Sequence, residues 1–454
     1  MSYIGSNPQT QSFIAGTDYF NGDGSTTAFT LSRSVVSTND IQATVNNVVQ
    51  QPNTAYTVSG TTITFTSAPS SGTANIYVRY LSTTTQSITP SQNTVSYSTL
   101  NSDNQSKLGI SFKNRIINGA MVIDQRYAGA ATANTINSYT LDRWKIDQSA
   151  STGKLVVQQN AGSVTPPAGF TYYLGVTSQS SYSVAAGDEY LLTQYVEGYN
   201  VADLGWGTAN AKTITVSFWV RSSLTGSFGG SIGNSANTRF YPFSFTISTA
   251  NTWEQKAITI VGDTSGTWLT NNSTGLYLRY GLGVGTTYGS GTAGAWTGTY
   301  ADVPTGSVSV VGTSGATFYL TGVQLEVGTQ ATTFDYRSYG TELALCQRYY
   351  ETTFGTGVAV GTGSAPATFR GSTTVYGPNS YFGTLIFKVS KRADPTINFW
   401  DGGTSGNLSC YTTSSASSLV GIAQNITTTG CSGNIAAVTN LTFVQGNWTA
   451  SAEL

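Results

Sequence analysis

Residues 213–221, TITVSFWVR, constrain the possible fold of this chain more than any other stretch. Apolar side chains at Ile214, Val216, Phe218 and Val220 alternate with the residues between them. Successive side chains of a β-strand point to opposite faces of its sheet, so this alternation predicts a strand with one buried face. The surrounding chain is therefore expected to build a sheet with a packed interior.

Residues 112–339 contain more stretches of this kind, and we assign them to one central domain, the body. The further predicted strands are residues 116–123, 155–158, 190–196, 240–247, 256–261, 276–280 and 318–327. About eight strands or more, with long loops and few helices, are typical of a jelly-roll-like β-sandwich.

The stretch at residues 318–350 marks the end of the body. Four side chains are predicted to share one face of the strand that closes its sheet: Tyr319, Val323, Leu325 and Val327. The period then changes, and residues 341–350 fit a short helix with Thr341 as a candidate N-cap after a break at Gly340. We interpret this helix as the junction between the body and a separate C-terminal domain.

Three further segments complete an all-β organisation. Residues 1–82 contain short alternating runs separated by Asn-Gly, Asp-Gly, Asn-Asn and Ser-Gly turns, which predicts a small β-sandwich; Asp23 there is expected in an Asx-turn. Residues 83–111 are polar and poor in large apolar side chains, so they are predicted to be a linker or shaft. Residues 340–454 are predicted to form a C-terminal β-sandwich, the tip, which begins with the junction helix.

Charge and histidine content exclude several classes of function. The chain has 20 Lys and Arg against 21 Asp and Glu, so its net charge is −1 and it has no general field to attract nucleic acid or an anionic membrane. It has no histidine, which removes serine triads, Cys–His dyads and His-based zinc sites. We expect no metal, no cofactor and no nucleic-acid partner.

The cysteines and the N-terminus bear on where the protein works. Cys346, Cys410 and Cys431 have no CxxC spacing; Cys410 and Cys431 either pair across adjacent strands or are buried free thiols. The N-terminal sequence has no secretory signal pattern, and no apolar run approaches the about 20 residues of a membrane span, so we expect no membrane insertion. Synthesis in a host cytoplasm, combined with a weakly charged composition typical of proteins outside cells, favours a virion component.

The order of elements in residues 18–80 has a precedent. The segments FNGDGSTTAFTLSRSV and VNNVVQQPNTAYTVSGTTITFTSAPSSGTANIYVRY resemble a module found near the N-termini of bacteriophage tail fibres and other virion appendage proteins. The resemblance implies attachment to other phage tail proteins through residues 1–82, rather than catalysis.

Phrases in the body and the tip also resemble phage tail fibres. They are FKNRIINGAMVIDQR, YTLDRW, ITVSFWVRSS, FYLTGVQLEVGTQATTFDYRSYGTELALCQRYYE, KVSKRADPTI and GNWTASAEL. The body resembles jelly-roll carbohydrate-binding modules more weakly. These resemblances imply a fibre of the virion tail, commonly a homotrimer, with a host-surface polysaccharide or lipopolysaccharide as receptor. Leu343, Leu345 and Tyr349 of the junction helix are the candidate contacts between the copies.

The glycine-rich loop at residues 281–306 holds the first candidate binding residues. Tyr288, Trp296 and Tyr300 lie among glycines with no strand pattern to bury them. Exposed aromatic rings on such a loop stack against the apolar faces of sugar rings, while loop amides bind the hydroxyls. The alternative is that these rings pack against the body core or a neighbouring subunit.

Two further clusters are candidates of the same kind. Tyr199, Asp203 and Trp206 lie between two predicted strands, where Asp203 would accept hydrogen bonds from sugar hydroxyls. The alternative is a loop that Trp206 pins to the body. In the tip, three aromatic residues flank turns and would suit a distal binding face: Tyr376, Tyr381 and Trp400.

Polysaccharide cleavage is a third hypothesis for this chain. Glycoside hydrolysis requires two carboxylates at a fixed separation and needs no histidine. The candidate acids are Asp142, Asp147, Asp188, Glu189, Glu197, Asp203, Glu326 and Asp335. No pair stands out, and the sequence lacks the internal period of a β-helix, the usual scaffold of depolymerising tail spikes. We therefore favour a receptor-binding fibre without enzymatic activity, followed by a purely architectural tail adaptor, and place a depolymerase last.

Overall fold

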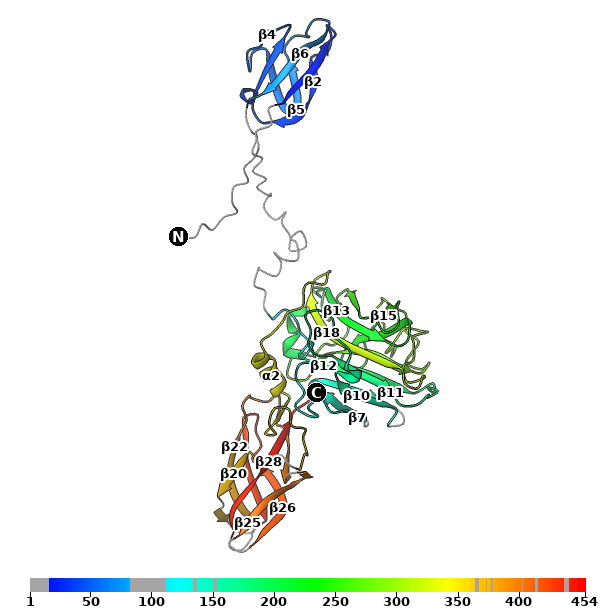
Figure 1. Ribbon diagram of the computed structural model, residues 1–454, viewed down its shortest axis with the longest axis vertical. Coiled ribbons are helices and arrows are strands. Elements are labelled where there is room, and N and C mark those ends of the chain that lie inside the picture. The colour runs from blue at the N-terminus through cyan, green and yellow to red at the C-terminus, as the bar shows by residue number, and fades with distance from the viewer. Residues whose placement is uncertain are drawn as a thin grey trace. The chain divides into compact units, whose positions relative to one another are not determined.

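The computed structural model describes residues 16–81, 112–133, 137–149, 153–363, 367–372, 374–376, 379–401, 403–412, 415–436 and 441–454. The chain divides into two compact units, Met1–Ser96 and Tyr97–Leu454, which we describe separately. The linker predicted at residues 83–111 lies outside the described residues, and the predicted domain boundaries stay predictions. Strands dominate both units, so the all-β class with one short helix at the end of the body is confirmed (Figure 1).

The N-terminal unit is a small β-sandwich with its own core. One sheet has the order β1 (Thr17–Gly22), β6 (Gly72–Tyr80), β3 (Ile41–Val45) and β4 (Val48–Val49), and β2 (Ala28–Val35) pairs with β5 (Tyr56–Phe65). A short 3₁₀ helix, η1 (Thr38–Asp40), precedes β3. Leu31, Ile63 and Val78 are buried between the strands, as their alternation predicts.

Most turns described in this unit agree with the turns predicted from the sequence. Asn46 and Asn47 both have positive φ between β3 and β4, as a two-residue hairpin turn requires. Asp23 accepts a hydrogen bond from the backbone N–H of Ser25, two residues on, at 2.8 Å, which confirms the predicted Asx-turn. The turn predicted around Gly60 is wrong, because Gly60 adopts positive φ inside the continuous strand β5.

The body is a sandwich of two six-stranded antiparallel sheets. The first body sheet has the order β16 (Glu254–Ile260), β13 (Ile214–Ser222), β18 (Thr317–Val327), β11 (Leu174–Ser178), β10 (Leu155–Gln159) and β7 (Thr132–Ala133). The second body sheet has the order β15 (Phe240–Ile247), β14 (Gly226–Gly233), β17 (Thr274–Val284), β12 (Glu189–Glu197), β9 (Trp144–Gln148) and β8 (Ser138–Leu141). Three 3₁₀ helices lie in the loops: η3 (Ala161–Ser163), η4 (Gly198–Asn200) and η5 (Ala202–Leu204). The facing sides of the two sheets share one hydrophobic core.

Six of the seven further body strands predicted, and β13 itself, are placed correctly or nearly so, and one prediction is wrong. Residues 116–123 form a turn at residues 117–120, with irregular backbone on either side, instead of a strand. The side chain of Asn118, a residue with positive φ, donates to the carbonyl oxygen of Ile123 and accepts from its N–H. Such local hydrogen bonds offer the backbone an alternative to a sheet ladder. Ile116 and Ile123 are nevertheless buried.

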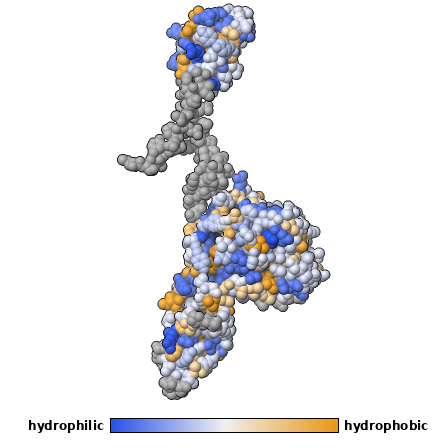
Figure 2. Space-filling model, viewed as in Figure 1, coloured by the Kyte–Doolittle hydropathy of each residue, from blue (hydrophilic) through white to orange (hydrophobic). Residues whose placement is uncertain are grey.

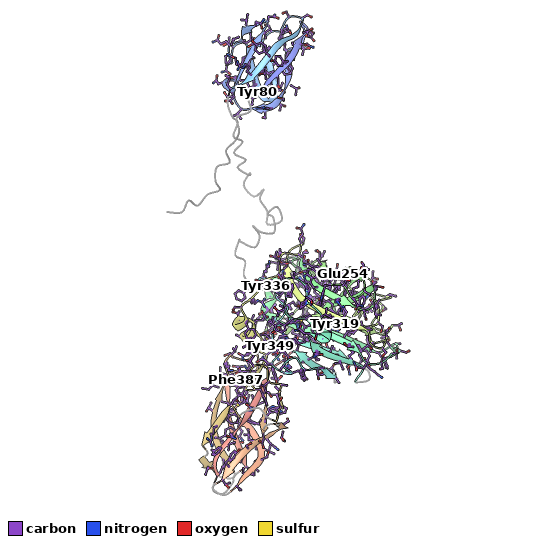
Figure 3. All side chains as sticks on the ribbon, viewed as in Figure 1. Tyr80, Glu254, Tyr319, Tyr336, Tyr349 and Phe387 are labelled. Carbon is purple, nitrogen blue, oxygen red and sulfur yellow. The ribbon has the colours of Figure 1, made fainter. Side chains whose placement is uncertain are left out.

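A β-bulge in β18 reverses part of the predicted side-chain pattern. Gly322 has a φ of 60°, and at this point β18 contains one residue more than β13 beside it. The extra residue reverses the alternation. Val323 and Leu325 therefore face the shared core, whereas Tyr319, which is labelled in Figure 3, belongs to a separate aromatic cluster on the outer face of the first body sheet. The prediction that Tyr319 shares a face with Val323 and Leu325 is wrong for this reason.

The junction helix is shorter than expected and begins earlier. Helix α2 runs over Tyr339–Gln347, with Ser338 rather than Thr341 at its N-cap position, and β19 (Tyr350–Thr352) follows it. Leu343 and Leu345 pack in a cluster that also contains Ile117 of the body. In the part of the chain that the structure describes, no helix is long and apolar enough to cross a membrane.

The tip strands are linked in one ten-stranded antiparallel sheet around a separate core. Its order is β21 (Thr374–Tyr376), β22 (Asn379–Ile386), β27 (Gly430–Ala436), β26 (Ala416–Gln424), β25 (Asn407–Thr412), β28 (Leu441–Ser451), β23 (Thr396–Asp401) and β24 (Thr404–Ser405). Strands β19 and β20 (Phe369–Ser372) also pair with β28. Phe382, Phe399, Leu408 and Trp448 are among the buried side chains.

All three cysteines are buried free thiols. Cys410 lies on β25 and Cys431 on β27, and strand β26 separates the two in the sheet. The first of the two alternatives, pairing across adjacent strands, is therefore excluded.

Candidate functional site

The glycine-rich loop that follows β17 lies on the outer face of the second body sheet. Val303 of this loop is so close to Gly229 of β14 and Gly281 of β17 that a Cβ atom at either glycine would overlap it. Glycine is thus needed at both positions for the close approach of another segment. In Figure 2 the body surface is mostly white and pale blue with scattered orange, as expected for a weakly charged composition.

Tyr288 and Tyr300, two of the predicted binding residues, pack edge to face on this loop. Their ring centres are 4.8 Å apart, and both side chains are partly buried. The Tyr300 ring also lies 4.7 Å from Phe240 of β15, and its hydroxyl accepts a hydrogen bond from Arg279 at 3.1 Å. Burial raises the pKa of Tyr300. Tyr300 is therefore fixed to the sheet by both its ring and its hydroxyl.

Arg279 of β17 organises the polar part of this face. Its side chain is only 7% exposed, and Nη1 donates to Oδ1 of Asp302 at 2.6 Å. The guanidinium lies 3.8 Å from the centre of the Tyr277 ring, a cation–π geometry. Among the described residues, the Nε of Arg279 has no partner.

Glu189 forms an acidic pair with Asp302. Burial, followed by the neighbouring Asp302 carboxyl, raises the pKa of Glu189. Two carboxyl groups that share a site cannot both ionise easily, so the protonated form of Glu189 is favoured. Within the described chain, Oε1 of Glu189 and Oδ2 of Asp302 have no hydrogen-bond partner. The pair supplies one donor and several acceptors at the border between the loop and the sheet.

Rows of cross-strand neighbours continue this polar surface. One row contains Lys145, Thr193, Arg279 and Ser231, and the adjacent row contains Tyr195 and Tyr277. Tyr195 donates to Asp147 at 2.8 Å, and Lys145 pairs with the same carboxylate at 2.9 Å. The hydroxyls of Thr193 and Ser231 are buried without a partner in the described part of the structure. This face therefore holds more hydrogen-bonding capacity than the chain itself uses.

Six residues make up what we call the sheet-face cluster: Glu189, Tyr195, Tyr277, Arg279, Tyr300 and Asp302. The cluster combines aromatic rings with donors and acceptors that are fixed in position by a rigid sheet. Rings match apolar ligand surfaces, and fixed polar groups determine the orientation of hydroxyl-bearing ligands.

Sequence reasoning missed most of this cluster. The sequence marks Glu189 only as one candidate acid among several and indicates no binding role for Tyr277, Arg279 or Asp302. The alternation of Tyr277 and Arg279 with Leu276 and Leu278 contained the signal, since it places both polar residues on the outer face of a predicted strand. Asp302 lies in a loop without periodicity, so only the tertiary structure brings it to Arg279.

Trp206 and Trp296 were predicted in separate clusters but meet in one. Their ring centres are 5.3 Å apart, and Trp268, which was not predicted, lies 4.7 Å from Trp206 and 5.6 Å from Trp296. The indole N–H groups of Trp206, Trp268 and Trp296 donate to the backbone carbonyls of Lys212, Ser265 and Val261, respectively. The three rings thus hold three loops against the body core. Glycan binding by Trp206 or Trp296 stays a prediction.

Tyr199 and Asp203 precede Trp206 by a few residues in the sequence, and both are exposed at the surface. Tyr199 is 61% exposed, and Asp203 pairs with Arg115 at 2.8 Å and Lys212 at 3.9 Å. The carboxylate of Asp203 is thus shared between two cations of the same chain, and its role toward a ligand stays a prediction.

The three candidate residues of the tip lie on different strands. Tyr381 on β22 and Trp400 on β23 are partly buried, and the Trp400 ring lies 6.0 Å from Phe354. Tyr376 ends β21, and its side chain lies outside the described part of the tip. A distal binding face formed by these residues stays a prediction.

The residues proposed for contacts between copies differ in accessibility. Tyr349 is fully buried within the chain, where its hydroxyl donates to Glu197 at 2.6 Å. Leu343 and Leu345 are only partly buried on α2. These two leucines are therefore the members of the predicted contact that retain surface for another chain.

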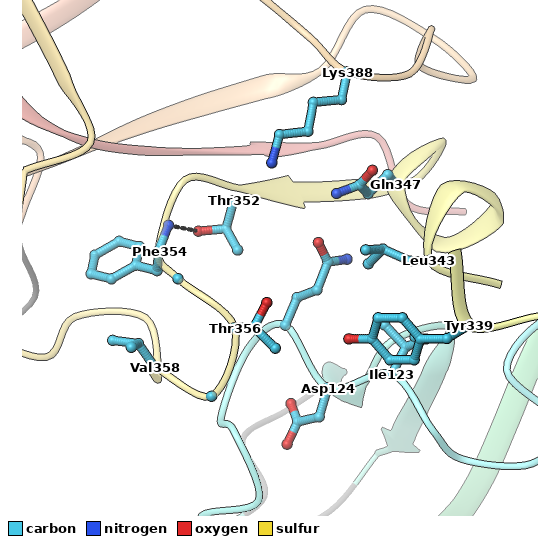
Figure 4. Close-up of a pocket in the computed structure, with 13 residues that line it drawn as sticks. Ile123, Asp124, Tyr339, Leu343, Gln347, Thr352, Phe354, Thr356, Val358 and Lys388 are labelled. Carbon is cyan, nitrogen blue, oxygen red and sulfur yellow. Dashed lines mark hydrogen bonds between the residues drawn. The ribbon is translucent and has the colours of Figure 1, made fainter. Parts of the chain in front are cut away.

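A pocket of about 80 Å³ lies beside α2 where the body meets the tip (Figure 4). Tyr339, Gln347, Asp124 and Lys388 are among the residues that line it. Asp124 already accepts hydrogen bonds from three backbone N–H groups, so its carboxylate is satisfied. Across the described residues, no group of three or more Cys, Asp or Glu side chains is arranged to hold a metal ion.

Comparison with known proteins identifies the N-terminal part of the chain. Residues 12–106 match the N-terminal domain of the phage T7 tail fibre protein, which confirms the resemblance to phage tail fibres. A search of curated proteins found no match to the sequence.

Several solved structures are similar to part of the chain. The enzymatically active domain of bacteriophage CBA120 tailspike protein 4 matches 48% of this chain at 11% identity with a TM-score of 0.26; the match covers 22% of that protein, so this chain spans about a fifth of its length. A family 4 carbohydrate-binding module matches 46% of this chain over 98% of its own, at 13% identity and a TM-score of 0.22. A family 61 module in complex with β-1,4-galactotriose matches 43% over its full length, at 12% identity and a TM-score of 0.21. Similarities of this size transfer no function to the chain.

Proposed function

We propose that this chain, which carries a tail fibre N-terminal domain at residues 12–106, is a structural component of a phage tail that attaches to the virion through this domain and recognises a host cell-surface glycan. The family match carries the proposal, because a tail fibre domain assigns the protein to the virion. Two folded β-regions follow this domain, and loops on rigid β-scaffolds are common binding sites.

The sheet-face cluster supports recognition of a glycan by the body. Tyr195 and Tyr300 present partly exposed rings beside the Arg279–Asp302 pair. A net charge of −1 provides no long-range attraction, so binding must depend on short-range contacts of this kind. Individual sugar sites are weak, and several copies in one fibre would add by avidity.

An adsorption competition tests the proposal. Purified full-length chain is expected to block adsorption of the virus that carries it, and to bind host cells. Tyr300→Ala is expected to weaken both effects, whereas Tyr339→Ala, which removes an exposed tyrosine of α2, is expected to leave them intact. If the unmodified chain neither blocks adsorption nor binds cells, receptor recognition fails and only the structural role remains.

The indole cluster favours a second function, that of an architectural adaptor between tail proteins. All three indole donors are used within the chain, as in a surface built for packing. This function requires Trp296 to lie at a protein interface in the assembled particle. Oxidative footprinting of intact virions is then expected to leave Trp296 unmodified, and efficient oxidation of Trp296 would contradict the adaptor role.

Polysaccharide cleavage is the function that the acidic side chains support least. Glycoside hydrolysis needs two carboxyl groups that are free to act on the bond between them, whereas Asp302 beside Glu189 is already paired with Arg279 at 2.6 Å. We therefore propose a binding protein without catalytic activity. Incubation of host polysaccharide with the chain is expected to release no new reducing ends.

The proposed fibre is a homotrimer with α2 near its axis. Leu343 and Leu345 are the partly exposed apolar residues that would meet their copies. Light scattering is expected to give a trimer mass for the full chain and a smaller mass for Leu345→Asp. A stable trimer of this variant would remove the packing role of Leu345.

A further inference from the structure

The bulge in β18 leaves space for an aromatic cluster of Phe170, Phe334 and Tyr336 on the outer face of the first body sheet. Gly322 has no Cβ atom, and a Cβ there would overlap the ring of Phe170. Phe170 in turn packs on Phe334 and Tyr336, with ring centres 5.1 and 5.5 Å away. Tyr336 is 56% exposed and donates to the carbonyl oxygen of Gly169 at 2.7 Å (Figure 3).

These three rings form one wall of a pocket of about 200 Å³. The other wall is polar and comes from residues near the start of the body and near α2: Asn114, Asp335, Arg337 and Glu342. Asp335, Arg337 and two of the rings belong to the phrase FDYRSYG, for which the proposed function assigns no role.

Arg337 and Asp335 keep unused hydrogen-bonding capacity beside this pocket. The side chain of Arg337 is only 6% exposed, and its terminal nitrogens bind the backbone carbonyls of Asn114 and Ile116 and the carboxylate of Glu342. Its Nε has no partner in the described structure. Asp335 accepts from the N–H of Asn114 through Oδ2 only, at 3.3 Å. A buried donor without a partner indicates that something else completes the site.

We propose that this pocket binds a single neutral pyranose ring of a glycan; the choice of ligand class rests on the proposed role in glycan recognition, but the site is separate from the sheet-face cluster. The aromatic wall matches the apolar face of a sugar ring. The carboxylate of Asp335 accepts from sugar hydroxyls, and Arg337 donates to one of them.

The charges and the size of the pocket define the ligand further. Asp335, Arg337 and Glu342 together give the lining a net charge of −1, which disfavours an acidic sugar. A volume of about 200 Å³ is below the about 300 to 1,000 Å³ of pockets for drug-sized ligands, so the site suits one ring of a longer chain.

Saturation-transfer NMR on the full-length chain tests this inference. The probes are the methyl glycosides of glucose, mannose and galactose, with methyl glucuronide as the acidic comparison. At least one neutral glycoside is expected to bind, and the glucuronide to bind more weakly. Tyr336→Ala and Asp335→Asn are each expected to weaken binding about tenfold.

Two further variants separate loss of the ring from loss of structure. Tyr336→Phe retains the ring and removes only the hydrogen bond to Gly169, so it is expected to bind like the unmodified chain. Tyr339→Ala removes a similarly exposed tyrosine three residues away and is also expected to bind normally. The inference is overturned if no neutral glycoside binds, if the glucuronide binds best, or if Tyr336→Ala and Asp335→Asn bind as tightly as the unmodified chain. Success in the adsorption competition combined with failure here would reject this pocket and leave the proposed function standing.

Discussion

The guanidinium of Arg143 lies 3.6 Å from the centre of the Tyr349 ring, and this contact joins the body to the segment that leads into the tip. Glu453 near the end of the chain pairs with both Arg143 and Arg126, and Arg126 lies 3.6 Å from the centre of the Tyr350 ring. A largely buried network of cations, carboxylates and rings therefore connects these two regions.

The first prediction concerns Glu453. Glu453→Gln leaves Arg143, which is 1% exposed, without its anionic partner. Removing one partner of a buried ion pair costs about 3 to 5 kcal/mol, so we expect a lower midpoint and separate melting of body and tip in calorimetry. Asp203→Asn, in an exposed pair with Arg115, is the control and should cost less than about 1 kcal/mol. A single unchanged transition for Glu453→Gln would contradict the coupling.

The second prediction concerns the pH dependence of the sheet-face cluster. Burial and the contact with Asp302 raise the folded-state pKa of Glu189 above its ordinary value of 4.5. The protonated form is thus favoured by folding, so the contribution of Glu189 to stability is complete below pH 4.5 and is lost as the pH rises through the raised value. Glu189→Gln imitates the protonated form and should remove this loss.

Chemical denaturation at pH 5 and pH 9 measures the effect. The stability of Glu189→Gln relative to the unmodified chain should increase between these pH values. Glu254→Gln is the comparison, because hydrogen bonding from Lys256 lowers the pKa of Glu254. That carboxylate is ionised in the folded chain and largely ionised in the unfolded chain at both pH values, so the stability difference for this variant should be nearly the same at pH 5 and pH 9. Parallel stability curves for the unmodified chain and Glu189→Gln would show that the acidic pair does not form.

The third prediction tests the contact between Gly322, at the bulge in β18, and the ring of Phe170. Gly322→Ala forces an alanine to a φ of 60° and places its Cβ against the ring, which should cost about 2 to 5 kcal/mol in urea denaturation. Gly306 also has positive φ, but nothing lies near its missing Cβ. Gly306→Ala should therefore show the conformational cost alone, about 1 to 2 kcal/mol. An equal loss of stability in the two variants would mean that the ring of Phe170 does not lie against Gly322.

The fourth prediction concerns Trp268. Trp268→Ala removes the ring between Trp206 and Trp296 and should lower the free energy of unfolding by about 3 kcal/mol. Trp268→Phe keeps an aromatic ring and should recover most of this loss. A shift of tryptophan fluorescence toward longer wavelength is expected for Trp268→Ala only. Unchanged stability would assign these rings to a surface role instead of packing.

Several features could be predicted from sequence because they depend on short-range periodicity. The alternation at residues 213–221 gave β13, and the same rule placed most other body strands within a few residues. The aromatic loop was found for a similar reason, as rings among glycines. Its position on the second body sheet was not predictable, because Val303 meets Gly229 and Gly281 only after the chain has folded.

The amino-acid sequence by itself determined the β class, the tail fibre domain at the N-terminus and the lack of histidine chemistry, because alternation, motif order and composition are properties of the chain. The tertiary structure decided which side chains act together. The single extra residue at Gly322 moved Tyr319 from the core to the outer face. Pairing of β12 with β17 brought Glu189 near Arg279, and the loop after β17 brought Asp302 to Arg279. Such contacts join residues that are distant in the sequence, so the local sequence pattern cannot predict them.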